Sequence, residues 1–285
     1  MAYFIEQRPI LGSAYGPELS ETSTPDLLVE RRRVSPNVSV VIPTLNEAEN
    51  LPHVLTRIPD CVNEVILVDG HSTDGTTAVA RQIRPDIRII YQTGRGKGNA
   101  LACGFRECSG NVIVMLDADG STDPEEIPRY VEALRRGADF AKGSRFLEGG
   151  GSDDITGFRS LGNHCLRQLV NTLFKSRYTD LCYGYNAFWA HCLPVMNVDC
   201  DGFEVETLIN VRVARAGLRV VEVPSYEFSR IHGVSNLNAF RDGRRVLSTI
   251  VREFFRPARR TEEVMGTAYQ KHLEAEDIAL EAVAE

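Results

Sequence analysis

Short β-branched runs alternate with helical stretches from residue 36 onward, and this alternation restricts the fold more than any other feature of the chain. The runs are VSVVI (38–42), EVILVD (64–69), IRIIY (87–91) and NVIVML (111–116). Each is followed by a stretch whose pattern predicts a helix, beginning at Asn46, Asp74, Lys97 and Asp123. The alternation indicates an α/β fold with a mostly parallel central sheet and helices on both faces. In such sheets ligands bind beyond the carboxyl ends of the strands.

The chain divides into three predicted parts. Residues 1–35 carry scattered Pro, Ser and Thr without a helix or strand period and predict an irregular N-terminal extension. We expect one catalytic domain over residues 36–258 and an acidic, Ala- and Glu-rich tail over residues 259–285. Within the domain, the stretch 144–202 is less regular. The later elements that the pattern predicts are helices at 160–175, 203–216 and 238–256 and a strand at 219–224.

Composition is that of a soluble globular protein. Of the 285 residues, 43% are hydrophobic and 25% are charged, which is enough to build a core. The net charge of −7 argues against nucleic acid as a partner, because a phosphate backbone needs a basic surface. We expect a cytoplasmic protein, since no apolar run approaches the ~20 residues of a membrane-spanning helix and the N-terminus lacks a signal-peptide pattern. The seven cysteines form no CxxC pair, which favours free thiols.

The polar segment Asp117-Ala118-Asp119 directly follows the apolar run 111–116. Residues two apart in an extended backbone lie on one side of it, so the two carboxylates converge. Hard oxygen ligands suit Mg²⁺ or Mn²⁺, and such ions keep positions open for substrate phosphates. The alternative is a helix cap, since Asp and Ser side chains before Pro124 suit the start of a helix. A DxD motif alone does not decide between the two.

The segment TGRGKGNA (93–100) is a second candidate for phosphate contact. Its glycine spacing matches neither GxGxxG nor GxxxxGK[ST], which argues against a dinucleotide-binding or P-loop fold. Glycines there would let the backbone approach a nucleotide, with Arg95 or Lys97 supplying charge near a diphosphate. Solvated surface side chains are the open alternative for both residues.

Four segments together resemble the family-2 glycosyltransferases. They are VSVVIPTLNEAENL, EVILVDGHSTDGT, GKGNALACGF and VIVMLDADGSTDP, in the order and approximate spacing of that family. The likeness is closest to the polyprenyl-phosphate, or dolichol-phosphate mannose synthase-like, branch and covers roughly residues 36 to 250. It implies a GT-A fold, a nucleotide-sugar donor and a divalent cation, Mg²⁺ or Mn²⁺. The ordered set is much more specific than any one motif.

The resemblance implies roles for residues on the donor side. The nucleotide sugar would be held by Pro43, Thr44, Asn46, Glu47, Asp69, Lys97, Asp117 and Ala118. Gly70-His71 stands where many members have Asp-Gly, so the base, uridine or guanosine, stays open, and we interpret His71 as a turn residue. The implied metal ligands are Asp117, Asp119 and Ser121, with Ser121 in place of the usual Gln.

On the acceptor side, the segment KGSRF makes Arg145 a candidate for binding an acceptor phosphate, joined by Arg159 and Asn163. Guanidinium groups suit phosphate oxygens, although surface arginines are the plain alternative. The segment SRIHGVSN resembles R-x-x-G-x-S-K, with Asn236 replacing the lysine, and implies that Arg230 neutralises the leaving diphosphate. Glu206 matches a family glutamate that often faces the active site.

These residues predict an inverting hexosyltransferase that uses a GDP- or UDP-sugar, with Asp119, Arg230 and Glu206 as its catalytic residues. The expected acceptor is a polyprenyl phosphate. Two alternatives stay open: transfer to a soluble saccharide or small metabolite, and a non-catalytic nucleotide-sugar-binding module. A lipid acceptor requires peripheral contact with the membrane, which the stretch VLSTIVREFFRPARR (246–260) would make unless it is only a helix packed on the domain.

Overall fold

The computed structural model describes residues 35–234 and 237–257. Its centre is a seven-stranded sheet with strand order β3-β2-β1-β4-β7-β5-β8. Neighbouring strands are parallel except at β7, which runs antiparallel to β4 and β5. The strands are β1 (Val38–Thr44), β2 (Val62–Asp69), β3 (Arg88–Tyr91), β4 (Val112–Met115), β5 (Phe140–Ser144), β7 (Asn186–Trp189) and β8 (Val220–Pro224). The predicted mostly parallel α/β sheet is confirmed.

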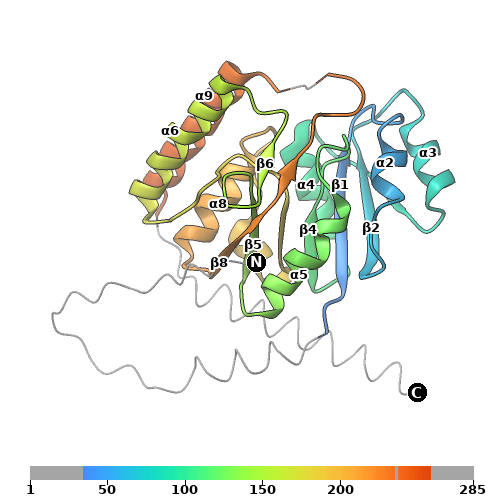
Figure 1. Ribbon diagram of the computed structural model, residues 1–285, viewed down its shortest axis with the longest axis horizontal. Coiled ribbons are helices and arrows are strands. Elements are labelled where there is room, and N and C mark those ends of the chain that lie inside the picture. The colour runs from blue at the N-terminus through green and yellow to red at the C-terminus, as the bar shows by residue number, and fades with distance from the viewer. Residues whose placement is uncertain (1–34, 235–236, 258–285) are drawn as a thin grey trace.

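Helices cover both faces of this sheet (Figure 1). They are α2 (Leu51–Leu55), α3 (Thr76–Ile83), α4 (Gly96–Glu107), α5 (Ile127–Arg135), α6 (Gly157–Phe174), α7 (Leu193–Met196), α8 (Val205–Arg215) and α9 (Ala239–Phe255). On one face, Phe105 of α4 meets the ring of Phe188 in β7, with centroids 5.4 Å apart. On the other face, Tyr130 of α5 lies over Gly143 of β5. A short second sheet pairs β6 (Gly151–Ser152) with β9 (Tyr226–Glu227).

Strand β1 lies inside the sheet, between β2 and β4, and is apolar on both sides. Val40, Val41 and Ile42 are completely buried, as a strand between two helical layers requires. Gly104 of α4 lies so close to Val41 that a Cβ there would stand 2.4 Å from a methyl group of that valine. Close packing of α4 on the sheet therefore depends on the absence of a side chain at Gly104.

Two strands lie in or beside the stretch that the sequence left irregular. β5 and β7 are five and four residues long, and neither shows a sustained apolar run. β7 enters the sheet antiparallel, so no helix connects it to a parallel neighbour in the way that the earlier units do. The pattern of strand and helix taking turns therefore did not reveal them.

The first predicted helix begins later than expected. Asn46 has φ 57°, a left-handed conformation, and α2 starts only at Leu51, after the cap Asn50. The prediction that a helix begins at Asn46 is wrong, and the Oδ1 of Asn46 accepts a hydrogen bond from the distant Thr73 N (2.9 Å). Asp74 does accept from Thr76 N at the start of α3 (3.0 Å), as expected.

The amphipathic helix predicted at 238–256 is α9, which packs against α6 and α8. Val246 and Ile250 of α9 join Val170 of α6 in a small apolar cluster. Across residues 35–234 and 237–257, no helix is both long and apolar enough to span a membrane. Residues 1–34 and 258–285, which hold almost all of the predicted extension and the whole predicted tail, lie outside the described residues.

Candidate active site

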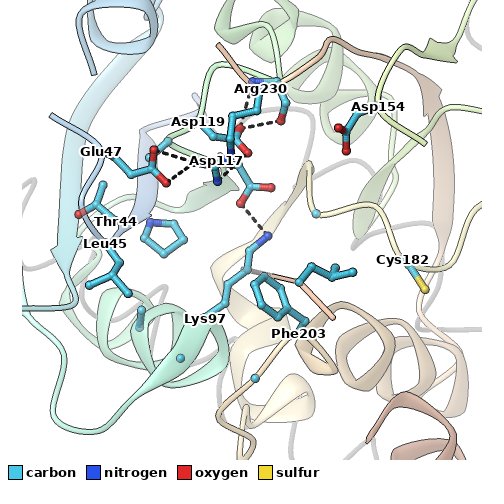
Figure 2. Close-up of a pocket in the computed structure, with 18 of the residues that line it drawn as sticks. Thr44, Leu45, Glu47, Lys97, Asp117, Asp119, Asp154, Cys182, Phe203 and Arg230 are labelled. Carbon is cyan, nitrogen blue, oxygen red and sulfur yellow. Dashed lines mark hydrogen bonds and ion pairs between the residues drawn. The ribbon is translucent and has the colours of Figure 1, made fainter. Parts of the chain in front are cut away.

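An open cavity of ≈ 530 Å³ lies beyond the carboxyl ends of β1, β2 and β4. It brings together side chains that are distant in the sequence (Figure 2). The predicted site residues on its wall are Pro43, Thr44, Glu47, Lys97, Asp117, Ala118, Asp119, Ser121, Arg145, Arg159 and Arg230. The predicted residues that are not on its wall are Asn46, Asp69, Asn163 and Glu206. Because ligands bind beyond the carboxyl ends of parallel strands, the sequence predicted the position of this cavity.

Asp119 is engaged on both carboxylate oxygens. Its Oδ1 accepts hydrogen bonds from the backbone N (3.0 Å) and the Oγ (2.7 Å) of Ser121. Its Oδ2 lies 3.2 Å from Nη2 of Arg230, and Nη1 of Arg230 lies 2.9 Å from Oε1 of Glu47. Arg230 therefore bridges the DxD segment and the loop after β1 (Figure 2). Burial raises the pKa of Glu47, although Asn50 and Arg230 oppose this shift.

The capping role proposed as an alternative for the DxD segment belongs to another residue. Asp123 accepts a hydrogen bond from Glu125 N (2.9 Å) at the start of the 3₁₀ turn Pro124–Glu126. Asp117 and Asp119 make no such contact with the start of a helix, and both face the cavity. A ligand-binding role therefore explains their position better than a cap does.

The segment that carries Arg230 is fixed over the DxD loop by main-chain bonds. Phe228 N donates to Ser121 O (2.8 Å) and Ile231 N donates to Asp119 O (3.3 Å). Gly120, at φ 76°, leaves the space that the side chain of Ile231 fills, because a Cβ at Gly120 would stand 2.5 Å from its Cδ1. The guanidinium of Arg230 is thus positioned by bonds on both sides of it.

Lys97, at the start of α4, neutralises the other DxD carboxylate. Its Nζ lies 2.6 Å from Oδ1 of Asp117 and 2.8 Å from Oε1 of Glu206, and its side chain is only 13% exposed. Burial alone would lower the pKa of Lys97, but the two carboxylates raise it above its ordinary value. Glu206 is buried behind Lys97, and this burial raises the pKa of its carboxyl despite the lysine.

The glycines before and after Lys97 make a contact that the sequence did not predict, and Gly96 also lies on the cavity wall. Gly98 N donates to Asp201 O (2.9 Å), and a Cβ on Gly96 or Gly98 would overlap the main-chain carbonyls of Asp201 and Cys200, respectively. They allow α4 to pack against the turn before α8. Arg95 is exposed, which agrees with the alternative of a solvated surface side chain. Lys97 is partly buried.

Four carboxylates surround two cations at this inner end of the cavity. Asp117 and Glu206 share Lys97, and Asp119 and Glu47 share Arg230. The formal excess of two negative charges suits a divalent cation, and the carboxylates with the Ser121 hydroxyl are hard oxygen donors. Within the described ranges, no three His, Cys, Asp or Glu side chains are grouped to hold a metal by themselves. These residues fit Mg²⁺ or Mn²⁺ if substrate oxygens complete the coordination.

The side of the cavity where the sequence predicts the nucleoside is formed by the ends of β1, β2 and β3. Asp69 is buried, and its Oδ2 accepts from Ser72 N (2.9 Å) while its Oδ1 has no partner among the described residues. His71, at φ 66°, is a turn residue as expected, and its ring stacks on Tyr91. Gln92, which the sequence analysis did not select, follows β3 and lies on the cavity wall. Its position directly after β3 is the signal that could have indicated it, because ligands bind beyond the carboxyl ends of the strands.

Arg145, which the sequence predicts to bind the acceptor, is buried and forms two ion pairs. Its Nε lies 2.7 Å from Oδ2 of Asp180, and its Nη1 lies 2.9 Å from Oε2 of Glu227. Burial opposes the charge, but these carboxylates raise the pKa of Arg145. Arg159 is more open and pairs only with Asp154 (2.7 Å) among the described residues. Both arginines reach the cavity wall.

Asn163 supports the site from behind. Its Oδ1 accepts hydrogen bonds from Leu181 N (3.2 Å) and Cys182 N (3.1 Å), which positions the segment bearing Cys182 on the cavity wall. Its contact with an acceptor stays a prediction. No local sequence pattern indicates the wall residues Phe203, Arg241 and Arg245, because their place depends on how α8 and α9 pack.

A family model described as glycosyl transferase family 2 matches residues 39–190. The chain therefore belongs to glycosyltransferase family 2, as its four sequence segments implied.

Its curated relatives act on lipid phosphates, according to their names. The undecaprenyl-phosphate mannosyltransferase of Micrococcus luteus is 35% identical over 215 residues, which cover 70% of this chain and 87% of the relative. The polyprenol monophosphomannose synthase of Mycolicibacterium smegmatis is 33% identical over 221 residues, covering 70% and 80%. The dolichol-phosphate mannosyltransferase of Pyrococcus furiosus is 32% identical over 208 residues, covering 70% and 59%. The expected likeness to this branch is confirmed.

Solved structures of similar fold include the glucosyl-3-phosphoglycerate synthase of Mycobacterium tuberculosis in complex with Mn²⁺, uridine diphosphate and glucosyl-3-phosphoglycerate. The TM-score is 0.62 at 21% identity, and the match covers 86% of this chain and 88% of the other. At that identity the likeness speaks for the fold alone. The predicted GT-A-type fold is confirmed.

Proposed function

We propose that the protein is a metal-dependent, inverting glycosyltransferase that moves a hexose from a GDP- or UDP-sugar to a polyprenyl phosphate. The observation that carries the proposal is the arrangement of charge in one cavity. Asp117 and Asp119 form an acidic inner end, whereas the acceptor side is lined by arginines. An acidic end suits a cation with a diphosphate, and arginines suit a phosphate acceptor. The relatives' names support the lipid acceptor.

In the proposed reaction, an acceptor phosphate oxygen attacks the anomeric carbon while the bond from that carbon to the nucleoside diphosphate breaks. A phosphate is already anionic, so the attack needs no general base. Arg230 faces the same cavity as Asp119 and would neutralise the departing diphosphate. Glu206 touches Lys97 and is not on the cavity wall, so we assign it to positioning that lysine.

A divalent cation, Mg²⁺ or Mn²⁺, held by Asp117, Asp119 and the hydroxyl of Ser121 would stabilise the charge of the leaving diphosphate. In the structure Lys97 pairs with Asp117 and Arg230 pairs with Asp119, so both cations would flank a diphosphate bound at these carboxylates. The nucleoside would lie against Pro43 and Thr44, near the unpartnered Oδ1 of Asp69.

We further propose that α9 touches the cytoplasmic face of a membrane. Phe240, Leu247, Val251 and Phe254 recur at helical spacing and are all exposed, which gives α9 an outward apolar face. The opposite face of α9 packs on the domain. Membrane contact and packing on the domain are therefore compatible. An apolar face with arginines beside it is typical of helices that lie in the membrane interface. Contact there would bring the cavity to a lipid substrate.

Transfer of labelled sugar tests the proposal. We expect purified protein with Mn²⁺ and labelled GDP- and UDP-sugars to give a product that extracts into organic solvent with undecaprenyl phosphate. The rate should be higher when this acceptor is presented in anionic vesicles than in neutral detergent. Transfer only to saccharides or small metabolites would favour the soluble-acceptor alternative. Binding of the nucleotide sugar without transfer to any acceptor would favour the non-catalytic module.

A further inference from the structure

Helices α6 and α9 lie side by side (Figure 1). Residues in the first turn of each helix line the cavity. Both begin with a small residue followed by Phe and Arg, and in both the amide of the arginine bonds to the capping side chain. The rings of Phe158 and Phe240 are 5.2 Å apart and are 57% and 79% exposed. The next residues, Arg159 and Arg241, line the cavity. An exposed aromatic pair therefore stands beside two arginines at the cavity mouth.

On the α9 side of this mouth two arginines pair with a single carboxylate, and Glu204 lies nearby, since a Cβ on Gly202 would stand 2.5 Å from its Oε2. Nε of Arg241 and Nη1 of Arg245 lie 3.3 Å and 3.5 Å from the same Oδ1 of Asp242. The other oxygen of Asp242 accepts from Asn238 N (2.7 Å). Within the described ranges, one carboxylate thus serves two guanidinium groups, and both arginine side chains are more than half exposed.

This arrangement differs from that of the deeper cations. Lys97, Arg145 and Arg230 each pair with two carboxylates, so none of them carries uncompensated charge. Arg241 and Arg245 are one turn apart on α9 and both face the cavity. Arg245 also borders the turn before α8, since a Cβ on Gly202 would stand 2.8 Å from its Nη1. The cavity therefore runs from an acidic inner end to a basic mouth.

We infer that Arg241 and Arg245 extend the predicted acceptor site of Arg145 and Arg159 to this mouth and bind oxygens of the acceptor phosphate there, and that Phe158 and Phe240 contact the first apolar units attached to that phosphate. The inference rests on the proposed function for the chemistry of the acceptor. Two guanidinium groups that share one carboxylate have donors left for phosphate oxygens. Exposed aromatic rings beside them match a ligand that is anionic at one end and apolar next to it. A small soluble phosphate would bind to the arginines but has no apolar group to contact the rings.

Binding of farnesyl phosphate to the full-length protein, measured by calorimetry below its micelle concentration, tests the inference. We expect the paired substitution Arg241→Gln with Arg245→Gln to raise the Kd at least about tenfold, as loss of charge-assisted hydrogen bonds should. Arg244→Gln removes the same charge from a neighbouring exposed position that is not on the cavity wall. That control should leave the Kd within about twofold of the wild-type value.

Phe240→Ala separates the lipid from a free phosphate. We expect it to weaken binding of farnesyl phosphate several-fold and to leave binding of glycerol phosphate unchanged. The inference is overturned if the paired arginine variant binds farnesyl phosphate like the wild type, if the wild type does not bind it, or if Phe240→Ala has no effect. Since no turnover is needed, arginine-dependent binding without sugar transfer would refute the proposed function and leave this inference standing.

Discussion

Replacing Asp119 with Asn should lower the rate of sugar transfer by about 10³-fold, a loss typical of removing a charged group that acts on the leaving group. Asparagine keeps the size of the side chain and an oxygen that can accept the two hydrogen bonds from Ser121. It removes the negative charge that would hold a divalent cation and that now faces Arg230. We would measure initial rates at saturating Mn²⁺ together with the thermal unfolding midpoint, which should change little.

Asp123→Asn is the matched control for this variant. Asp123 belongs to the same loop, but it caps the turn after it and pairs with Arg57 at the surface (2.8 Å), away from the cavity wall. It should keep transfer within about twofold of the wild type, because an exposed ion pair contributes little. A wild-type rate in Asp119→Asn would refute the metal assignment.

Replacing Lys97 with Met should lower the free energy of unfolding by about 3 kcal/mol, because it leaves buried carboxylates without their cation. Lys97 lies between Asp117 and Glu206, and Glu206 is almost fully buried. Adding Glu206→Gln should recover much of the loss, since the double variant no longer buries that charge. Denaturant unfolding in EDTA would measure both. Arg135→Met, which loses only an exposed pair with Glu132, should cost less than about 1 kcal/mol.

The Lys97→Met defect should also depend on pH. Burial holds the pKa of Glu206 above its ordinary value of 4.5, and loss of Lys97 would raise it further. The folded variant then keeps a proton that the unfolded chain releases, so stability falls as pH rises from about 4.5 through the folded pKa. The difference in the free energy of unfolding between Lys97→Met and the wild type should be small near pH 4 and larger at pH 8. An equal gap at both pH values would contradict this account of Glu206.

Much of the fold followed from local sequence because each of the parallel strands β1 to β4 combines a β-branched run with a polar segment and a helix after it. The apolar run before Asp117 and the polar residues after it marked both β4 and the edge where a ligand binds. β7 gave no such signal, because four residues that run antiparallel carry neither a long apolar run nor a following helix. Asn46 was misjudged because its left-handed backbone depends on contacts with the loop after β2, not on its neighbours.

The sequence predicted many residues of the site but not which of them form ion pairs with one another. Motif positions marked Glu47 and Arg230, yet nothing local indicates that they pair across 183 residues of sequence. In the same way, the burial of Arg145 between Asp180 and Glu227 follows from how three distant segments meet. Arg241 escaped notice because only the packing of α9 beside α6 places it on the cavity wall.

The central claim is that the cavity around Asp117 and Asp119 binds a nucleoside diphosphate through a divalent cation. Calorimetric titration of the wild-type protein with GDP and with UDP, each in Mn²⁺ and in EDTA, tests it most directly. We expect at least one nucleotide to bind with a Kd that is about 100-fold lower in Mn²⁺, and Asp119→Asn to abolish this difference. Equal affinity of both nucleotides in Mn²⁺ and in EDTA would contradict the claim.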